Sequence, residues 1–144
     1  MQEMTLKPVG EVRAPYRKRG DAPRQGRLSP VESIIEIRPE YAEALRDITD
    51  HPHLLVLTWF HLSRRDILVA TPPGSGKEHG VFATRSPERP NPLGLCLVDL
   101  LKVDGLRLTV RGLDALDGTP VVDIKPFHRD LDCPPAPDAD LAAS

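Results

Sequence analysis

The chain has 144 residues, of which 40% are hydrophobic and 28% are charged, and its formal net charge is −2. This length suits a single domain with one buried core. The slightly acidic balance argues against general binding of polyanions. The low aromatic content, one Trp, two Tyr and three Phe, also argues against an aromatic stacking platform for single-stranded nucleic acid.

The N-terminal part predicts a short strand over 9–13, which Pro15 ends. The stretch 16–30 that follows is rich in Gly and Pro and is predicted to be an irregular loop. Basic side chains gather in and beside it: Arg13, Arg17, Lys18, Arg19, Arg24 and Arg27. This cluster is either a local phosphate-binding patch or a solvated loop, and the residues alone leave both readings open.

Residues 33–38 are β-branched and predict a second strand. Pro39 then begins a helix over 39–48, because a proline in the first turn loses no intrahelical hydrogen bond. Ala44, Leu45 and Ile48 give this helix an apolar face at helical spacing. Pro52 prevents its continuation.

The best strand candidate is 53–62, a nearly continuous apolar run between breakers. Residues 67–70 are predicted to be its hairpin partner, and 71–76 a loop of turns. Four more short strands are expected over 81–84, 95–101, 106–110 and 121–124. Asp104-Gly105 between two of them predicts a hairpin.

These elements predict a mostly β fold: a small closed or nearly closed β-barrel of about seven strands with one short helix. The 16 prolines oppose long helices. The predicted strands and helices do not alternate along the chain, which argues against a doubly wound sheet. The barrel domain is expected over 1–133, with a flexible tail over 134–144.

Cys96 and Cys133 form no CxxC pair and are predicted to be free thiols in a reducing compartment. The first residues lack the apolar segment of a signal peptide, and no apolar run is long enough to span a membrane. We therefore expect a cytoplasmic protein without a membrane partner.

Three short patterns resemble functional motifs without meeting their requirements. The Gly74-Ser75-Gly76-Lys77 run is not a phosphate loop, because Thr71 and Glu78 stand where that motif needs Gly and Ser or Thr. His51 and His53 have no third ligand nearby in the sequence, so no metal site is predicted. The Arg64-Arg65 pair is expected to decorate the end of a hairpin, with RNA contact as the alternative.

The most informative segment is 80–95, which reads GVFATRSPERPNPLGL. An apolar stretch leads into a loop whose prolines at 87, 90 and 92 fix the backbone and reduce the entropy lost on binding. The loop presents Arg85, Arg89, Ser86 and Asn91, which suit an anionic or zwitterionic small molecule. The alternative is an ordered structural turn with surface arginines.

This segment closely resembles the signature of the TsaA-like (TrmO) family, in which G-(V/I)-F-A-T-R is followed by S-P-x-R-P-N-P-(I/L)-G. Three further elements match in the family's order: Val9–Val12 with Pro23-Arg24-Gln25, the strand ending Trp59-Phe60-His61, and 114–127, which reads DALDGTPVVDIKPF. Together the matches cover most of 9–127.

The resemblance implies a compact barrel, often dimeric, that binds S-adenosylmethionine and N-methylates threonylcarbamoyladenosine at position 37 of tRNA. It implies cofactor contacts from Pro23, Arg24, Gln25, His61, Leu62, Arg85, Leu95, Asp114, Ala115, Leu116 and Asp117. Arg89 and Asn91 become candidates for substrate binding, and no metal is implied.

The chemistry of the cofactor is compatible with these residues. Its amino group and ribose hydroxyls need acceptors, which Asp114 or Asp117 can supply, and its carboxylate needs a cation, which Arg24 or Arg85 can supply. Methyl transfer requires in-line alignment and a base that relieves the attacking nitrogen of its proton. Asp117, Asp123 and His61 are candidate bases, and the sequence does not rank them.

The chain departs from the family pattern at three positions and in length. Glu88 stands where an uncharged residue is usual, Cys96 replaces a common serine and is expected to be buried, and Phe127 replaces a tyrosine. Longer bacterial members carry a further C-terminal domain. Two alternatives therefore stay open: methylation of another acceptor, and a non-enzymatic module that binds S-adenosylmethionine.

Overall fold

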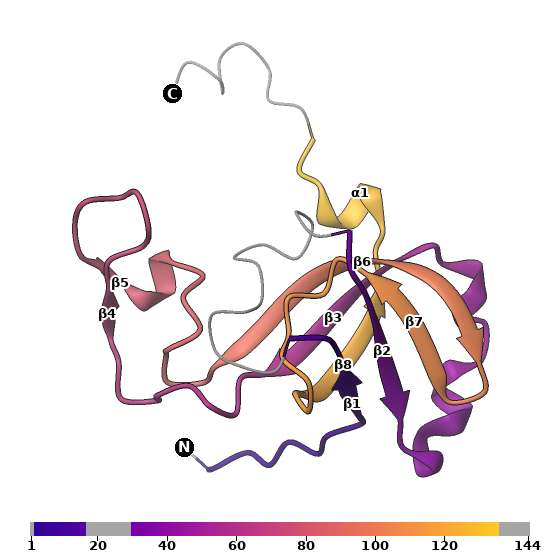
Figure 1. Ribbon diagram of the computed structural model, residues 1–144. Helices are drawn as coiled ribbons and strands as arrows, with labels where there is room; N and C mark the ends of the chain where they lie inside the picture. Colours follow the sequence, from indigo (N-terminus) through magenta and orange to yellow (C-terminus); the bar gives the residue numbers. More distant parts are fainter. Residues whose placement is uncertain (1, 17–29, 136–144) are drawn as a thin grey trace.

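The computed structural model describes residues 2–16 and 30–135. Its core is a closed antiparallel barrel in which the strands follow the order β1-β2-β7-β6-β3-β8 and β8 pairs with β1 (Figure 1). The barrel strands are β1 (Gly10–Arg13), β2 (Glu32–Ile37), β3 (His53–Trp59), β6 (Leu93–Asp104), β7 (Arg107–Arg111) and β8 (Pro120–Pro126). The predicted mostly β barrel is therefore confirmed, with six strands in the barrel rather than seven.

The barrel forms because alternate residues of its strands are apolar and point inward. In β3, Leu54 and Val56 are buried, and in β6 Val98 is fully buried. Both cysteines are free; Cys96 is buried in the same core, as expected, whereas Cys133 is only partly buried. The side chains that fill the interior are Val12, Ala14, Ile35, Ile37, Leu54, Val56, Cys96, Val98, Leu108, Val110, Leu113, Ala115 and Val121.

Two predicted strand assignments between β3 and β6 are wrong. The segment 67–70 does not pair with β3, because β6 and β8 already occupy both edges of that strand. Instead β4 (Val69–Ala70) pairs with β5 (His79–Gly80) in a separate ribbon that projects from the barrel (Figure 1).

The second wrong assignment is the strand expected over 81–84. Val81–Ala83 forms a 3-10 turn, η4, in which Val81 is buried while the side chain of Phe82 is 86% exposed. A closed barrel offers this apolar stretch no free edge. The predicted long strand at 53–62 also stops at Trp59, and a turn closed by Ser63 N–H donating to Phe60 O follows it.

The predicted helix over 39–48 consists of two 3-10 segments, η2 (Pro39–Leu45) and η3 (Ile48–Asp50). Asp47 between them adopts a left-handed conformation with φ 67°, which interrupts helical continuation. Leu45 and Ile48 pack against the core as expected, whereas Ala44 is exposed. A short helix that the sequence did not indicate, α1 (Arg129–Asp132), follows β8.

The hairpin predicted at Asp104-Gly105 is confirmed as the connection of β6 to β7. Asp104 is the last residue of β6, so the two turn residues are Gly105 and Leu106. Gly105 has φ 61°, a value that glycine adopts without steric cost. None of the helices in the two described ranges is long and apolar enough to cross a membrane.

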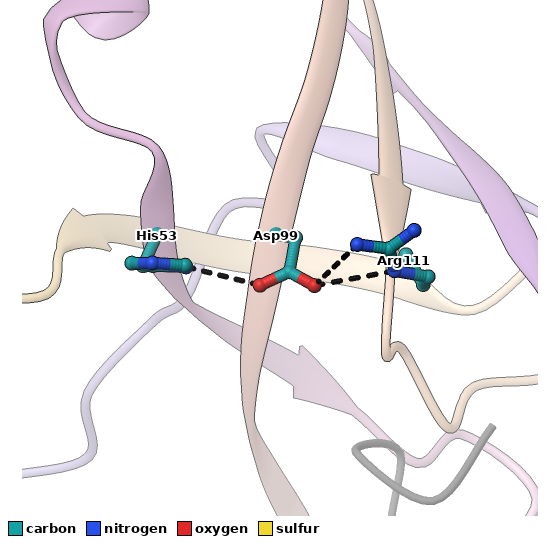
Figure 2. Close-up of polar contacts among 3 residues, drawn as sticks. All are labelled: His53, Asp99 and Arg111. Atoms are coloured by element: carbon teal, nitrogen blue, oxygen red, sulfur yellow. Dashed lines mark hydrogen bonds and ion pairs between the residues drawn. The ribbon is translucent and has the colours of Figure 1, made fainter. Parts of the chain in front are cut away.

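A charged ladder crosses three strands on the outer face of the barrel (Figure 2). Asp99 of β6 lies directly opposite His53 of β3 and Arg111 of β7. His53 Nδ1 lies 3.0 Å from Asp99 Oδ1, and Arg111 Nε and Nη2 donate to Asp99 Oδ2 at 3.2 and 3.1 Å. The carboxylate is only 15% exposed, so its bonds lie partly out of water and tie β3 and β7 to β6.

The substitution Asp99→Asn is expected to lower the free energy of unfolding by ~1 kcal/mol, because it removes the charge that both neighbours share. Urea denaturation measures this change. Asp104→Asn, at the exposed end of the same strand, is the matched control and should change stability little. Equal midpoints for the two variants would show that the ladder does not stabilise the barrel.

Candidate functional site

A cavity of about 350 Å³ opens where the loop after η4 folds back on the start of β6. Its volume falls within the ~300–1,000 Å³ typical of small-molecule sites. The lining combines apolar, cationic and acidic side chains: Phe60, Thr84, Arg85, Arg89, Asn91, Leu93, Gly94, Leu95 and Asp114. Five of the residues predicted for cofactor or substrate contact therefore lie around one cavity, namely Arg85, Arg89, Asn91, Leu95 and Asp114.

The proline-rich loop that forms one wall is held by its own side chains. Arg89 Nη1 donates to the backbone oxygens of Thr84 and Ser86, at 3.0 Å each. Thr84 Oγ1 donates to Val81 O at 3.0 Å and accepts from Ser86 N at 3.3 Å. These bonds, together with the prolines, give the loop the order expected from the sequence. Arg89 thus also supports the loop from within.

Arg65 fastens the same loop to β3, a role that the sequence did not indicate. Its Nε donates to Pro90 O at 2.7 Å and its Nη2 to Asn91 Oδ1 at 2.9 Å. Its guanidinium lies 5.1 Å from the centre of the Trp59 ring, within the range of a cation–π interaction. No spacing in the sequence relates position 65 to 90, so only the fold shows this clamp. The neighbouring Arg64 pairs with Asp66 instead.

Arg85 lines the cavity, and its side chain reaches the backbone of β6. Its Nη2 donates to Leu95 O at 3.1 Å, which leaves other guanidinium N–H groups for a ligand. The Leu95 side chain is 48% exposed and adds an apolar surface beside the cation. This arrangement suits a ligand with an anionic group and a flat apolar part.

Asp114 supplies the acidic group of the cavity from the β7–β8 connection. Its carboxylate accepts a hydrogen bond from the Cys96 thiol. Burial raises the pKa of Asp114, whereas the bond from Cys96 and the charge of Arg85 lower it. Burial, with the nearby negative charge of Asp114, raises the pKa of Cys96 to about 12. The thiol is therefore protonated at neutral pH and acts as the donor.

Asp117, three residues after Asp114 in the sequence, has a different environment. Its Oδ1 accepts from Ala14 N at 3.1 Å, and its own N–H donates to Tyr16 O at 2.6 Å. It lines a separate hollow of about 570 Å³ beside Arg13. The structure thus ties Asp117 to the end of β1 and does not place it in the lining of the Arg85 cavity.

The other predicted contacts are spread over the molecule. Ala115 is buried in the core, and Leu116 O accepts the hydroxyl of Thr119 at 2.7 Å. His61 and Leu62 lie exposed in the turn after β3. The predictions for Pro23, Arg24 and Gln25, for the basic loop at 17–29 and for the tail from 136 lie outside the described residues.

Asp123, the remaining candidate base, lies on β8 and pairs with Lys125 at 3.1 Å. It lines a third, mainly apolar hollow beside η2 and η3. None of the three candidate bases, Asp117, Asp123 and His61, therefore lines the Arg85 cavity. Among residues 2–16 and 30–135, no group of three or more His, Cys, Asp or Glu could hold a metal ion.

The architecture defines the class: a small closed β-barrel with a mixed-charge cavity formed by a proline-rich arginine loop. A sequence model described as "tRNA-methyltransferase O N-terminal domain" matches residues 11–133. The chain belongs to this TrmO family, which confirms the resemblance found in its motifs.

Relatives of two kinds match the chain. A "Probable S-adenosyl-L-methionine-binding protein" of Methanothermobacter thermautotrophicus is 54% identical over 130 residues, which are 90% of this chain and 94% of the relative. The "tRNA (adenine(37)-N6)-methyltransferase" of Escherichia coli is 38% identical over 138 residues, which are 88% of this chain and 59% of that enzyme.

A solved structure agrees with the barrel. The crystal structure of TrmO from Pseudomonas aeruginosa superposes with a TM-score of 0.76 at 32% identity, and it covers 94% of this chain. This chain in turn spans 61% of that structure, so the likeness extends over the barrel domain and not over the whole of the longer protein.

Proposed function

We propose that the chain is a methyltransferase that binds S-adenosylmethionine in the Arg85–Asp114 cavity and methylates N6 of threonylcarbamoyladenosine at position 37 of tRNA. The observation that carries the proposal is one cavity that combines an arginine with further N–H donors, a carboxylate and exposed apolar side chains of β6, in a chain of the TrmO family. The named E. coli relative supports tRNA as the substrate class.

The residues of the cavity fit the groups of the cofactor. Arg85 matches its carboxylate, as an arginine fork binds such an anion well. Asp114 matches its amino group or ribose hydroxyls, and the apolar surface of Phe60, Leu93 and Leu95 matches adenine. When bound, the cofactor supplies an electrophilic methyl group.

The chain's own contribution to the reaction is alignment. The loop of Arg85 is held by the internal bonds of Arg89 and by the Arg65 clamp, so a bound cofactor would meet a wall that needs little reordering. Arg89 and Asn91 border the same cavity and are assigned to the acceptor. His61, Asp117 and Asp123 stand as predictions for the base.

A homodimer is the second part of the proposal. On the outer face of the barrel, the apolar side chains of β3 lie opposite those of β6, as Leu55 with Leu97, Leu57 with Leu95, and Trp59 with Leu93. An apolar ladder of this kind is typical of a surface that a partner covers. Leu93 and Leu95 belong to both the ladder and the cavity wall, so a second copy would lie beside the cofactor. We further propose that the protein acts in the cytoplasm, where a tRNA substrate is found, and that it has no membrane partner.

The proposed reaction is tested with purified protein, methyl-labelled S-adenosylmethionine and tRNA that carries threonylcarbamoyladenosine. Mass spectrometry of the digested tRNA should show the labelled N6-methyl nucleoside. Cofactor binding without label in any tRNA nucleoside would contradict the tRNA assignment, and it would favour another acceptor or the binding module that the name of the archaeal relative describes.

Sedimentation of the wild type and of Leu57→Lys tests the proposed dimer, because a charge in the apolar ladder should dissociate it.

A further inference from the structure

Cys96 lies immediately behind the acidic group of the cavity. It belongs to β6 between Leu95 and Leu97 and points inward, with 6% of the residue exposed. Its Sγ donates to Oδ1 of Asp114, which approaches from the β7–β8 connection. The bond therefore joins the barrel wall to the one carboxylate among the residues that line the cavity.

We propose that Cys96 is a positioning residue: its thiol holds Oδ1 of Asp114, so that the ionised carboxylate keeps Oδ2 for a cationic or hydroxyl group of the ligand. The identity of that ligand rests on the proposed function, whereas the Cys96–Asp114 pair does not depend on it.

The electrostatics of the site favour such a donor. Burial favours the neutral acid and raises the pKa of Asp114. Two side chains oppose this effect, the Cys96 thiol from β6 and the Arg85 guanidinium from the proline-rich loop. Because the pKa of Cys96 is about 12, the thiol remains a donor throughout the neutral range.

The direction of the pH effect follows from these contacts. An ionised carboxylate accepts from a cationic or hydroxyl group more strongly than the neutral acid does, so binding should weaken as the pH falls through the pKa of Asp114. Removal of the thiol removes a contact that lowers this pKa. The weakening should then begin at a higher pH, and a serine hydroxyl at position 96 should reverse the change.

A buried residue that only fills volume would behave differently. Cys96→Ala and Cys96→Ser change the volume of the side chain in the same region of the core, but only serine retains a donor. The two substitutions therefore form a matched pair. Cys133→Ser serves as the common background, because it leaves Cys96 as the one thiol of the chain.

The first measurement is an NMR titration of the Asp114 side-chain carboxyl in the full chain without ligand. In Cys96→Ala the midpoint should rise by about one pH unit, the size expected for one charge-assisted hydrogen bond. In Cys96→Ser it should return close to the wild-type value. An unchanged midpoint in Cys96→Ala would overturn the proposal.

Calorimetry with S-adenosylmethionine then tests the consequence for binding. Below the Asp114 midpoint, Cys96→Ala should bind about tenfold more weakly than the wild type, and the two should converge about two pH units above it. Thermal unfolding confirms that each variant is folded. If the wild type does not bind S-adenosylmethionine, the proposed function fails and the titration alone decides the role of Cys96. If Cys96→Ala binds like the wild type at every pH, the positioning role fails and the function stands.

Discussion

Arg85→Ala is expected to weaken S-adenosylmethionine binding by about 10- to 100-fold. The substitution removes the proposed charge-assisted bond to the cofactor's carboxylate, an interaction of ~1.5–3 kcal/mol. It also removes the bond from Arg85 Nη2 to Leu95 O, which fastens the loop to β6 beside the apolar surface proposed for adenine. Calorimetry measures the loss of affinity directly, and methyl transfer to tRNA should fall with it at a limiting cofactor concentration.

Two further variants separate charge from geometry. Arg64→Ala removes an arginine that pairs with Asp66 and does not line the cavity, so the cofactor affinity of this variant should match that of the wild type. Arg85→Lys keeps the positive charge without the planar fork, so its cofactor affinity should lie between those of Arg85→Ala and Arg64→Ala. If Arg85→Ala bound the cofactor as tightly as Arg64→Ala, the cavity would not be the cofactor site.

Gly94→Ala is expected to damage both stability and cofactor binding. A Cβ at this position would collide with the Phe60 ring and with Thr58 Oγ1. Thr58 lies directly opposite Gly94 on β3 and is 1% exposed, so it has no room to move. The Phe60 ring would have to shift, and such overpacking costs ~1–3 kcal/mol of unfolding free energy.

The effect on binding follows because Phe60 and Gly94 both line the cavity. Urea denaturation measures the loss of stability, and calorimetry measures the loss of affinity. The matched control is Gly80→Ala in β5, where a Cβ would meet no atom within 4 Å and the backbone has φ −60°. This control should retain wild-type stability. Equal unfolding curves for the two alanine variants would contradict the close approach of Phe60 to β6.

The cavity wall is the part of the site that the sequence predicted best. The segment 80–95 pointed to Arg85, Arg89, Asn91 and Leu95, and these residues do lie around one cavity. Their proximity follows from short sequence separation and from prolines that restrict the backbone locally. No comparable restriction distinguished Asp114 from Asp117, and the sequence left both as acceptors.

Long-range contacts decided what the local pattern left open. Asp117 accepts from the backbone of Ala14, a residue more than one hundred positions away, while Asp114 meets Cys96. The Arg65 clamp on Pro90 and Asn91 likewise joins residues without a shared motif. In each case the partner depends on which strands become neighbours when the barrel closes.

The sequence by itself determined that this protein is a mostly β barrel with a stiff arginine loop, because alternating burial and proline geometry act over a few residues. It could not determine that six strands close the barrel, nor that 81–84 turns away from it, because closure uses every strand edge at once. Only the tertiary structure brought Asp114, and not Asp117, into the lining of the Arg85 cavity. That choice depends on hydrogen bonds between distant segments, which no local pattern encodes.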